Sequence, residues 1–309
     1  MLNSFNNKNN KTMKKTVLLS VMLMAAFAAK AQLKVAPKIM MGDEKSYVTT
    51  SVINMPGQKP VTITEETTYK VAEVLSEGCV LSVENTKVTS DATADNVAGQ
   101  LIAATQELMM GVEIRLAADM EGVPQRILNF DEVKKKITTA ADVLIDKMLK
   151  TAPQLAQMPK EALKAQITEN ATQENMLKSL TNGASPLALN GKTIMTGAQD
   201  EYVNDQSLKM KRMYFVNGNK VTTNSTMNMS KDEMKQLIID TVTKMAPDQA
   251  EMIKQNIDQV MASGMVKIDM KETVVYDMQD DGWVKNITSE TTNESMGQNI
   301  TMKATVSLK

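Results

Sequence analysis

The chain has 309 residues, 35 Lys and Arg against 36 Asp and Glu, and no histidine. The lack of histidine excludes Ser-His-Asp triads, imidazole metal sites and histidine proton relays, and the even charge balance offers no basic footprint for nucleic acid. A single cysteine, Cys79, excludes an intrachain disulfide, and no nucleophile elbow, phosphate-binding loop or dinucleotide-binding motif occurs.

Residues 1–31 have the pattern of a secretory signal peptide. Two lysines precede the apolar run of residues 16–29, and an Ala-Lys-Ala cleavage pattern ends at Ala31. Cleavage there would remove five lysines and no acid, leaving a mature chain with a net charge of about −6. We therefore expect an exported protein, periplasmic or extracellular, with no integral membrane segment in the mature chain and no nucleic-acid partner.

The first half of the mature chain is predicted to form strands, a helix and a hairpin. Apolar residues alternate with polar ones in much of this region, as in Val61, Ile63, Tyr69 and Val71, which is typical of half-buried strands. The expected elements are strands at 45–53, 61–71 and 79–88, a helix at 92–110, and a hairpin at 112–129 that turns at Glu121-Gly122. Cys79 falls on an apolar face and is expected to be a buried thiol.

Two helices should follow, then a linker. Asn129 and Glu132 have the spacing of a capping box for the first helix, and Pro159 suits the start of the second, at about 160–180. The Gly- and Asn-rich stretch 182–199 is the best candidate for a linker.

The second half repeats the same kinds of element. Two strands should meet at a hairpin near Asn217-Gly218, and Ser230 with Glu233 should cap a helix. Another helix should run from Pro247 to Gly264, and three strands should end the chain.

These elements predict an α+β fold: one large, curved, half-barrel-like antiparallel sheet whose apolar face is covered by helices. "DEVKKKI" and "DEMKQLI" recur in the two halves, which favours an old duplication. The chain can be divided into an N-terminal α+β half at 32–181, the linker at 182–199 and a C-terminal α+β half at 200–309. The alternative is one continuous domain, 32–309.

The stretch "YDMQDDGWVKNIT" (276–288) combines three aspartates with the only tryptophan. Its spacing partly fits a calcium loop, but the last ligand position holds Thr288 in place of the bidentate glutamate. Short acidic side chains also bond their own backbone in turns. We interpret the stretch as a corner between two strands, and expect no metal and no cofactor.

Six residues form the candidate ligand-binding site. Glu65 and Glu272 interrupt the apolar faces of two similar strands, each four residues before a tyrosine, Tyr69 or Tyr276. The mature chain also contains 23 methionines, whose flexible side chains accept ligands of varied shape, and Met270 and Met302 lie on apolar faces. The glutamates could be polar anchors in an apolar pocket or a general acid and base. Alternatively, they lie solvated at the rim of the sheet.

Three stretches carry a resemblance to known proteins: "GDEKSYVTTS", "GNKVTTNSTMNM", and the ending "YDMQDDGWVKNITSETT" with "ITMKATVSL". They resemble an uncharacterised family of exported bacterial proteins, a domain of unknown function. The resemblance rests on strands and turns and implies no catalytic or binding residues. The long Thr-rich strands are also similar, by fold analogy, to the half-barrels of periplasmic lipoprotein carriers.

We expect a non-catalytic cell-envelope protein that binds an apolar or amphipathic, lipid-like small molecule. The rival hypothesis is a structural or protein-interaction module that docks another envelope protein. A carboxylate-based enzyme is the third hypothesis.

Overall fold

The computed structural model describes residues 32–93, 96–151, 160, 164, 168, 171–204, 206–245, 247–262, 268–295 and 298–309. The predicted signal peptide lies outside the described residues, as do the predicted helix start at Pro159 and helix end at Gly264.

Strands are the commonest element of the described chain. In chain order they are β1 (Gln32–Lys34), β2 (Glu44–Asn54), β3 (Val61–Leu75), β4 (Gly78–Ser90), β5 (Ile114–Ala118), β6 (Pro124–Ile127), β7 (Thr193–Met195), β8 (Gln199–Val203), β9 (Lys209–Asn217), β10 (Lys220–Met227), β11 (Ile268–Met278), β12 (Val284–Ser295) and β13 (Gln298–Leu308). Eleven of them form one antiparallel sheet in the order β6-β5-β4-β3-β2-β13-β12-β11-β10-β9-β8, and β1 pairs with β7 separately.

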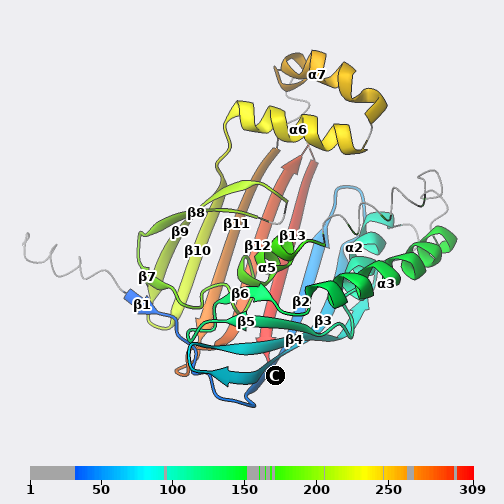
Figure 1. The fold of residues 1–309 in the computed structure, drawn as a ribbon. Coiled ribbons are helices and arrows are strands. Elements are labelled where there is room, and N and C mark those ends of the chain that lie inside the picture. The colour runs from blue at the N-terminus through cyan, green and yellow to red at the C-terminus, as the bar shows by residue number, and fades with distance from the viewer. Residues whose placement is uncertain are drawn as a thin grey trace, which may run out of the picture.

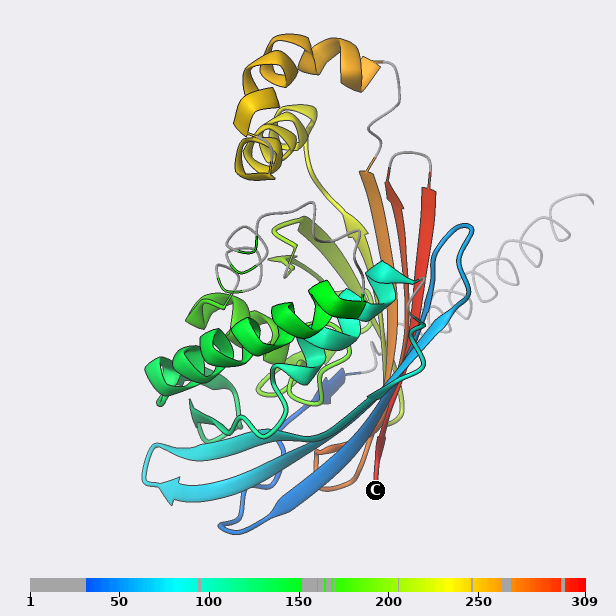
Figure 2. The same cartoon turned by 90° about the vertical axis from the view of Figure 1, so that its right-hand side faces the viewer.

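The sheet is curved, and three of the described helices lie on its concave side (Figures 1 and 2). The described helices are α2 (Val97–Glu107), α3 (Phe130–Thr151), α5 (Gln173–Thr181), α6 (Lys231–Met245) and α7 (Pro247–Ala262). In Figure 1 α2, α3 and α5 lie in front of the curved strands, and in both views α6 and α7 extend beyond one end of the sheet. The predicted α+β, half-barrel-like sheet is thus confirmed.

Strands from both ends of the chain meet in the middle of this sheet. β13 pairs with β2 from Leu308 opposite Tyr47 to Thr301 opposite Asn54. The stretches 32–181 and 200–309 therefore contribute adjacent parts of one sheet, without a gap in the hydrogen-bonded ladder.

The largest core cluster lies between the concave face and the segments that cover it. Inward-facing residues of strands throughout the sheet contribute to it, among them Tyr47, Leu81, Tyr214 and Ile287. Cys79 belongs to the same cluster, so the expected buried thiol is confirmed.

The three predicted turns occur where the sequence places them. β5 and β6 are joined through Gly122, and β9 and β10 through Gly218, both with positive φ. The stretch 276–288 contains the end of β11, a corner at 279–283 and the start of β12. In this corner the Asp281 carboxylate accepts a hydrogen bond from the backbone N–H of Trp283 at 3.0 Å. Trp283 itself is 2% exposed and belongs to the core.

Of the two predicted capping boxes, one is confirmed and one is wrong. The Glu233 N–H donates to the Ser230 hydroxyl, and the Ser230 N–H donates to the Glu233 carboxylate at 2.8 Å. The Asn129 side chain instead bonds the backbone of the neighbouring strand, at Glu113 and Arg115. A tertiary pairing thus replaces the local cap, although α3 still begins at the next residue.

Two further expectations fail around residue 182. The helix predicted at about 160–180 is interrupted at residues 171–172, and α5 starts anew with Thr172 as its N-cap. The stretch 182–199 is not an exposed linker, because Leu187 and Leu189 are 2% and 0% exposed. Part of this stretch forms β7, and its apolar residues fill space under the concave sheet.

Candidate functional site

A cavity of about 670 Å³ lies between the concave face of the sheet and the segments that cover it. Its lining includes inward-facing residues of β2, β3, β11, β12 and β13 on the sheet side. Opposite them lie residues from α2, from α5 and from the segment 182–186 that follows α5. The first five residues of the predicted linker therefore form part of the cavity wall.

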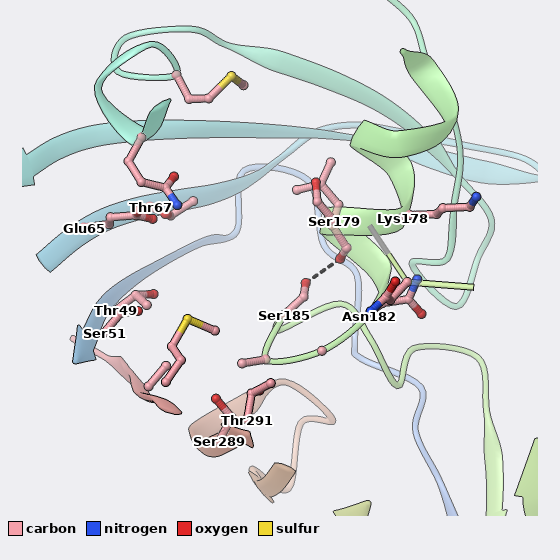
Figure 3. A pocket seen from close by; sticks show the side chains of 18 of the residues that line it. Thr49, Ser51, Glu65, Thr67, Lys178, Ser179, Asn182, Ser185, Ser289 and Thr291 are labelled. Atoms are coloured by element: carbon pink, nitrogen blue, oxygen red, sulfur yellow. Dashed lines mark hydrogen bonds between the residues drawn. The ribbon is translucent and has the colours of Figure 1, made fainter. Parts of the chain in front are cut away.

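The sheet side of this cavity carries several polar side chains. Short hydroxyl side chains lie where alternation places inward-facing residues, and Figure 3 shows them from neighbouring strands around the cavity. They are Thr49 and Ser51 on β2, Thr67 on β3, and Ser289 and Thr291 on β12. These groups can both donate and accept hydrogen bonds.

Apolar side chains complete the lining. Ile102 comes from α2, Met176 and Leu180 from α5, and Met270 and Met302 from the sheet. A lining that combines aliphatic and thioether side chains with hydroxyls suits a ligand with both apolar and polar parts.

Five of the six residues selected from the sequence line this cavity: Glu65, Tyr69, Met270, Glu272 and Met302. Met302 is 38% exposed, so the cavity is accessible to solvent at this position. The sixth residue, Tyr276, does not line the cavity. It is 1% exposed and belongs to the core cluster, and its hydroxyl donates a hydrogen bond to the carbonyl of Gly183.

Glu65 and Tyr69 occupy the same face of β3. Glu65 is half-buried, and burial raises the pKa of its carboxyl group. Tyr69 is buried and packs edge-on against Tyr47, with ring centroids 5.6 Å apart. Burial also raises the pKa of Tyr69, so it remains a neutral phenol that can donate or accept.

Glu272 lies in a second polar part of the lining. Its carboxylate accepts a hydrogen bond from the hydroxyl of Tyr202 at 3.1 Å. Burial and the nearby charge of Glu272 raise the pKa of Tyr202 to about 12. Two residues earlier, on the same face of β11, Met270 accepts a hydrogen bond at its sulfur from the Asn204 side chain at 3.3 Å.

Glu65 and Glu272 are far apart along the sheet. Three strands, β2, β13 and β12, lie between β3 and β11. At the usual spacing of strands, the distance from β3 to β11 measured along the sheet is about 19 Å. The strand pairing also aligns Glu65 with Tyr276 across the sheet, through Thr49, Val306 and Ile287. Glu272 lies on β11 four residues from Tyr276, which adds a separation of about 13 Å along the strand direction. Carboxylates that act as a pair on one bond lie about 5–10 Å apart, so this arrangement favours two separate polar contacts.

A charged cluster beside the cavity was missed by the sequence analysis. Arg212 on β9 holds Asp200 on β8 through two hydrogen bonds of 2.9 and 2.8 Å. The Tyr214 hydroxyl and the Lys192 ammonium also bond Asp200, at 2.7 and 3.4 Å. Arg212 stands among inward-facing apolar residues in "KMKRMYFVN", and this break in the alternation was the available signal.

No group of three or more Cys, Asp or Glu side chains placed to hold a metal ion occurs in the described parts of the chain. Among the helices of those same parts, none has the length and apolarity needed to cross a bilayer.

Comparison with known proteins identifies no family: no family model and no curated protein matches the chain. A structure that describes lipid–protein interactions in lipovitellin is 9% identical with a TM-score of 0.38, over 88% of this chain and 25% of lipovitellin. DynF from the dynemicin biosynthesis pathway of Micromonospora chersina is 7% identical with a TM-score of 0.18, over 91% of this chain and 86% of DynF. A porin-like protein from Bacteroides uniformis is 11% identical with a TM-score of 0.19, over 89% of this chain and 98% of its own. At these TM-scores the similarities carry no argument about function.

Proposed function

We propose that this protein is an exported cell-envelope protein that binds an amphipathic, lipid-like molecule in the cavity between the sheet and α5, without catalysing a reaction. The observation that carries the proposal is the cavity of about 670 Å³ with a mixed apolar and hydroxyl-rich lining. Sites for small molecules typically enclose about 300–1,000 Å³ and combine apolar walls with a few polar groups.

The distribution of the lining residues supports an elongated ligand. The two acidic positions, Glu65 and Glu272, are separated both across and along the sheet. Methionines lie between and around them, and Met side chains repack at low cost around chains of different length. A flexible acyl or alkyl chain fits such a lining better than a compact rigid molecule.

The chemistry of the site supports binding over catalysis. The separation of Glu65 and Glu272 argues against a general acid and base acting on one bond. The raised pKa of Tyr69 keeps its phenol neutral, and the raised pKa of the buried Cys79 thiol does the same for the sulfur. Neither group is poised as a nucleophile at neutral pH.

Blocking the cavity tests the proposal. Ala304 lies on the inward face of β13 and lines the cavity, whereas Thr305, the next residue, is exposed on the other face. Purified protein should bind the fluorescent apolar dye N-phenylnaphthylamine at micromolar concentration. Ala304→Phe should abolish this binding, and Thr305→Phe should retain it.

Mass spectrometry of organic extracts provides an independent readout, since protein from its native host should carry a lipid-like molecule. Circular dichroism should first show that both variants are folded. The proposal is wrong if a folded Ala304→Phe protein binds the probe as the unmodified protein does, or if the unmodified protein binds no amphiphile.

A further inference from the structure

We infer that the polar part of the ligand carries hydrogen-bond donors, as an amine or a hydroxyl group does, and that Glu65 and Glu272 select it over an anionic head group. This inference rests on the proposed function and adds the chemical class of the ligand. It comes from the charges and hydrogen-bonding capacities of the described residues that line the cavity.

Charged side chains in the lining are mainly acidic. Glu65 and Glu272 lie on the sheet side, and Lys178 of α5 lies on the opposite side. The Lys178 ammonium already pairs with Glu174, one turn earlier on the same helix, at 2.6 Å. A carboxylate or phosphate that entered the cavity would thus meet two acidic groups and one cation that has a partner, which is unfavourable at short range.

The acceptor atoms around Glu272 point to the same ligand chemistry. Asn293, on the neighbouring strand β12, lines the cavity, and its Oδ1 is buried without a hydrogen-bond partner in the described part of the chain. The register places Asn293 opposite Met270 and Thr291 opposite Glu272. A buried acceptor that lacks a donor costs free energy, and a ligand N–H or O–H would supply the donor.

Glu65, on β3, also favours a ligand group that carries hydrogen-bond donors. Its carboxyl group is half-buried beside the hydroxyl-bearing residues Thr49 and Thr67. A buried carboxylate is costly unless it is paired or hydrogen-bonded. A donor group of the ligand, and an ammonium most of all, would offset this cost, whereas an anion would increase it.

Four probes with the same dodecyl or lauroyl chain separate these cases: dodecylammonium, monolauroylglycerol, dodecyltrimethylammonium and dodecanoate. Their affinities are measured by displacement of N-phenylnaphthylamine at pH 7.5, below the concentrations at which they form micelles. Dodecylammonium and monolauroylglycerol should bind at least about tenfold tighter than dodecanoate, as expected for hydrogen bonds to charged groups. Dodecyltrimethylammonium has the charge without the donors and should bind more weakly than dodecylammonium.

Variants assign the preference to the two glutamates. The double substitution Glu65→Gln with Glu272→Gln should remove most of the preference for dodecylammonium over dodecanoate, and Glu65→Gln alone should reduce it. The matched control is Glu66→Gln, because Glu66 lies between two inward-facing residues and its carboxylate pairs with Lys309 at 2.5 Å. This control should keep the full preference.

The outcomes distinguish this inference from the proposed function. Equal or tighter binding of dodecanoate would overturn the inference and leave the proposed function standing. Equal binding of the two cations would overturn the requirement for donors, and an unchanged preference in folded Glu65→Gln would overturn the role of that residue. Failure of all four probes and of the dye to bind would overturn the proposed function, and the inference with it.

Discussion

The hydroxyl of Tyr276 donates a hydrogen bond to the backbone carbonyl of Gly183, 93 residues earlier in the chain. Tyr276 lies on β11, and Gly183 belongs to the segment after α5 that lines the cavity. The bond therefore joins the concave sheet to the opposite wall of the cavity. Burial, with a contribution from the charge of Glu272, raises the pKa of Tyr276, so its proton stays in place at neutral pH.

Tyr276→Phe should destabilise the protein by about 1–3 kcal/mol, because the Gly183 carbonyl would lose its donor in a buried place. The measurement is chemical unfolding followed by tryptophan fluorescence, which reports Trp283. Thr64→Val, which removes a hydroxyl from the outer face of β3, should change the free energy of unfolding much less. Equal effects of the two substitutions would mean that the hydrogen bond to Gly183 does not stabilise the fold.

The cluster around Asp200 predicts a pH dependence of stability. Burial alone would raise the pKa of Asp200, but hydrogen bonds from Arg212 and Tyr214 and the charges of Arg212 and Lys192 lower it to about 2. A carboxylate whose pKa is lower in the folded state stabilises the protein above its unfolded pKa, near 4. This contribution should be lost as the pH falls from about 4 to about 2. Because the Asp200 side chain is 37% exposed, solvent screening limits it to about 1 kcal/mol.

Asp200→Asn tests this relationship at neutral pH. The substitution leaves Arg212, whose side chain is 5% exposed, without its carboxylate partner. Because the Asp200 side chain is 37% exposed, solvent screening should limit the cost of this loss too to about 1 kcal/mol. The variant should melt at a lower temperature at pH 7. Between pH 4 and pH 2 its free energy of unfolding should fall less than that of the unmodified protein. A variant with the unmodified pH profile would show that Asp200 does not titrate as proposed.

Gly282, in the corner between β11 and β12, should tolerate no side chain. Its φ is +82°, and a Cβ placed there would lie 2.5 Å from the carbonyl oxygen of Ala36. Gly218, in the hairpin between β9 and β10, also has positive φ but no atom within 4 Å of such a Cβ. Gly218→Ala should therefore cost only the backbone strain of about 1–2 kcal/mol.

Gly282→Ala should cost clearly more than Gly218→Ala, since it adds displacement of the chain at Ala36 to the same strain. Thermal melts of the two variants give the comparison directly. Similar melting temperatures would indicate that the segment at Ala36 can move away without loss of stability.

The alternation of the strands predicted much of the cavity lining. Glu65, Glu272 and Met302 were selected because they lie on faces that alternation turns toward the core, and period-two geometry is a local property that a sequence reveals. The pairing of β13 with β2 could not be predicted in this way, since it joins segments at opposite ends of the chain.

The errors arose where long-range contacts override local patterns. Tyr276 shares its strand face with Glu272, but its hydroxyl is bonded to the loop at Gly183, and no local pattern predicts that contact. Leu187 and Leu189 are buried in a stretch whose glycines and asparagines are typical of an exposed linker. Arg212 was overlooked, because an arginine within an apolar face is stable only with a partner such as Asp200, from another strand.

Met302 offers the sharpest test of the cavity with the least risk to the fold. It lines the cavity and is 38% exposed, so a charged side chain at this position can remain hydrated when no ligand is bound. An apolar chain in the cavity would remove that hydration, and burial of an unpaired charge is costly. Met302→Glu should therefore weaken the binding of N-phenylnaphthylamine and of monolauroylglycerol by at least about tenfold, or 1.4 kcal/mol. Met302→Leu, which keeps an apolar side chain of similar size, should bind both probes as the unmodified protein does.

Met270 is buried, so Met270→Glu should lower the melting temperature as well and is a less informative test than Met302→Glu. Binding that is unchanged in folded Met302→Glu would place the apolar part of the ligand away from β13.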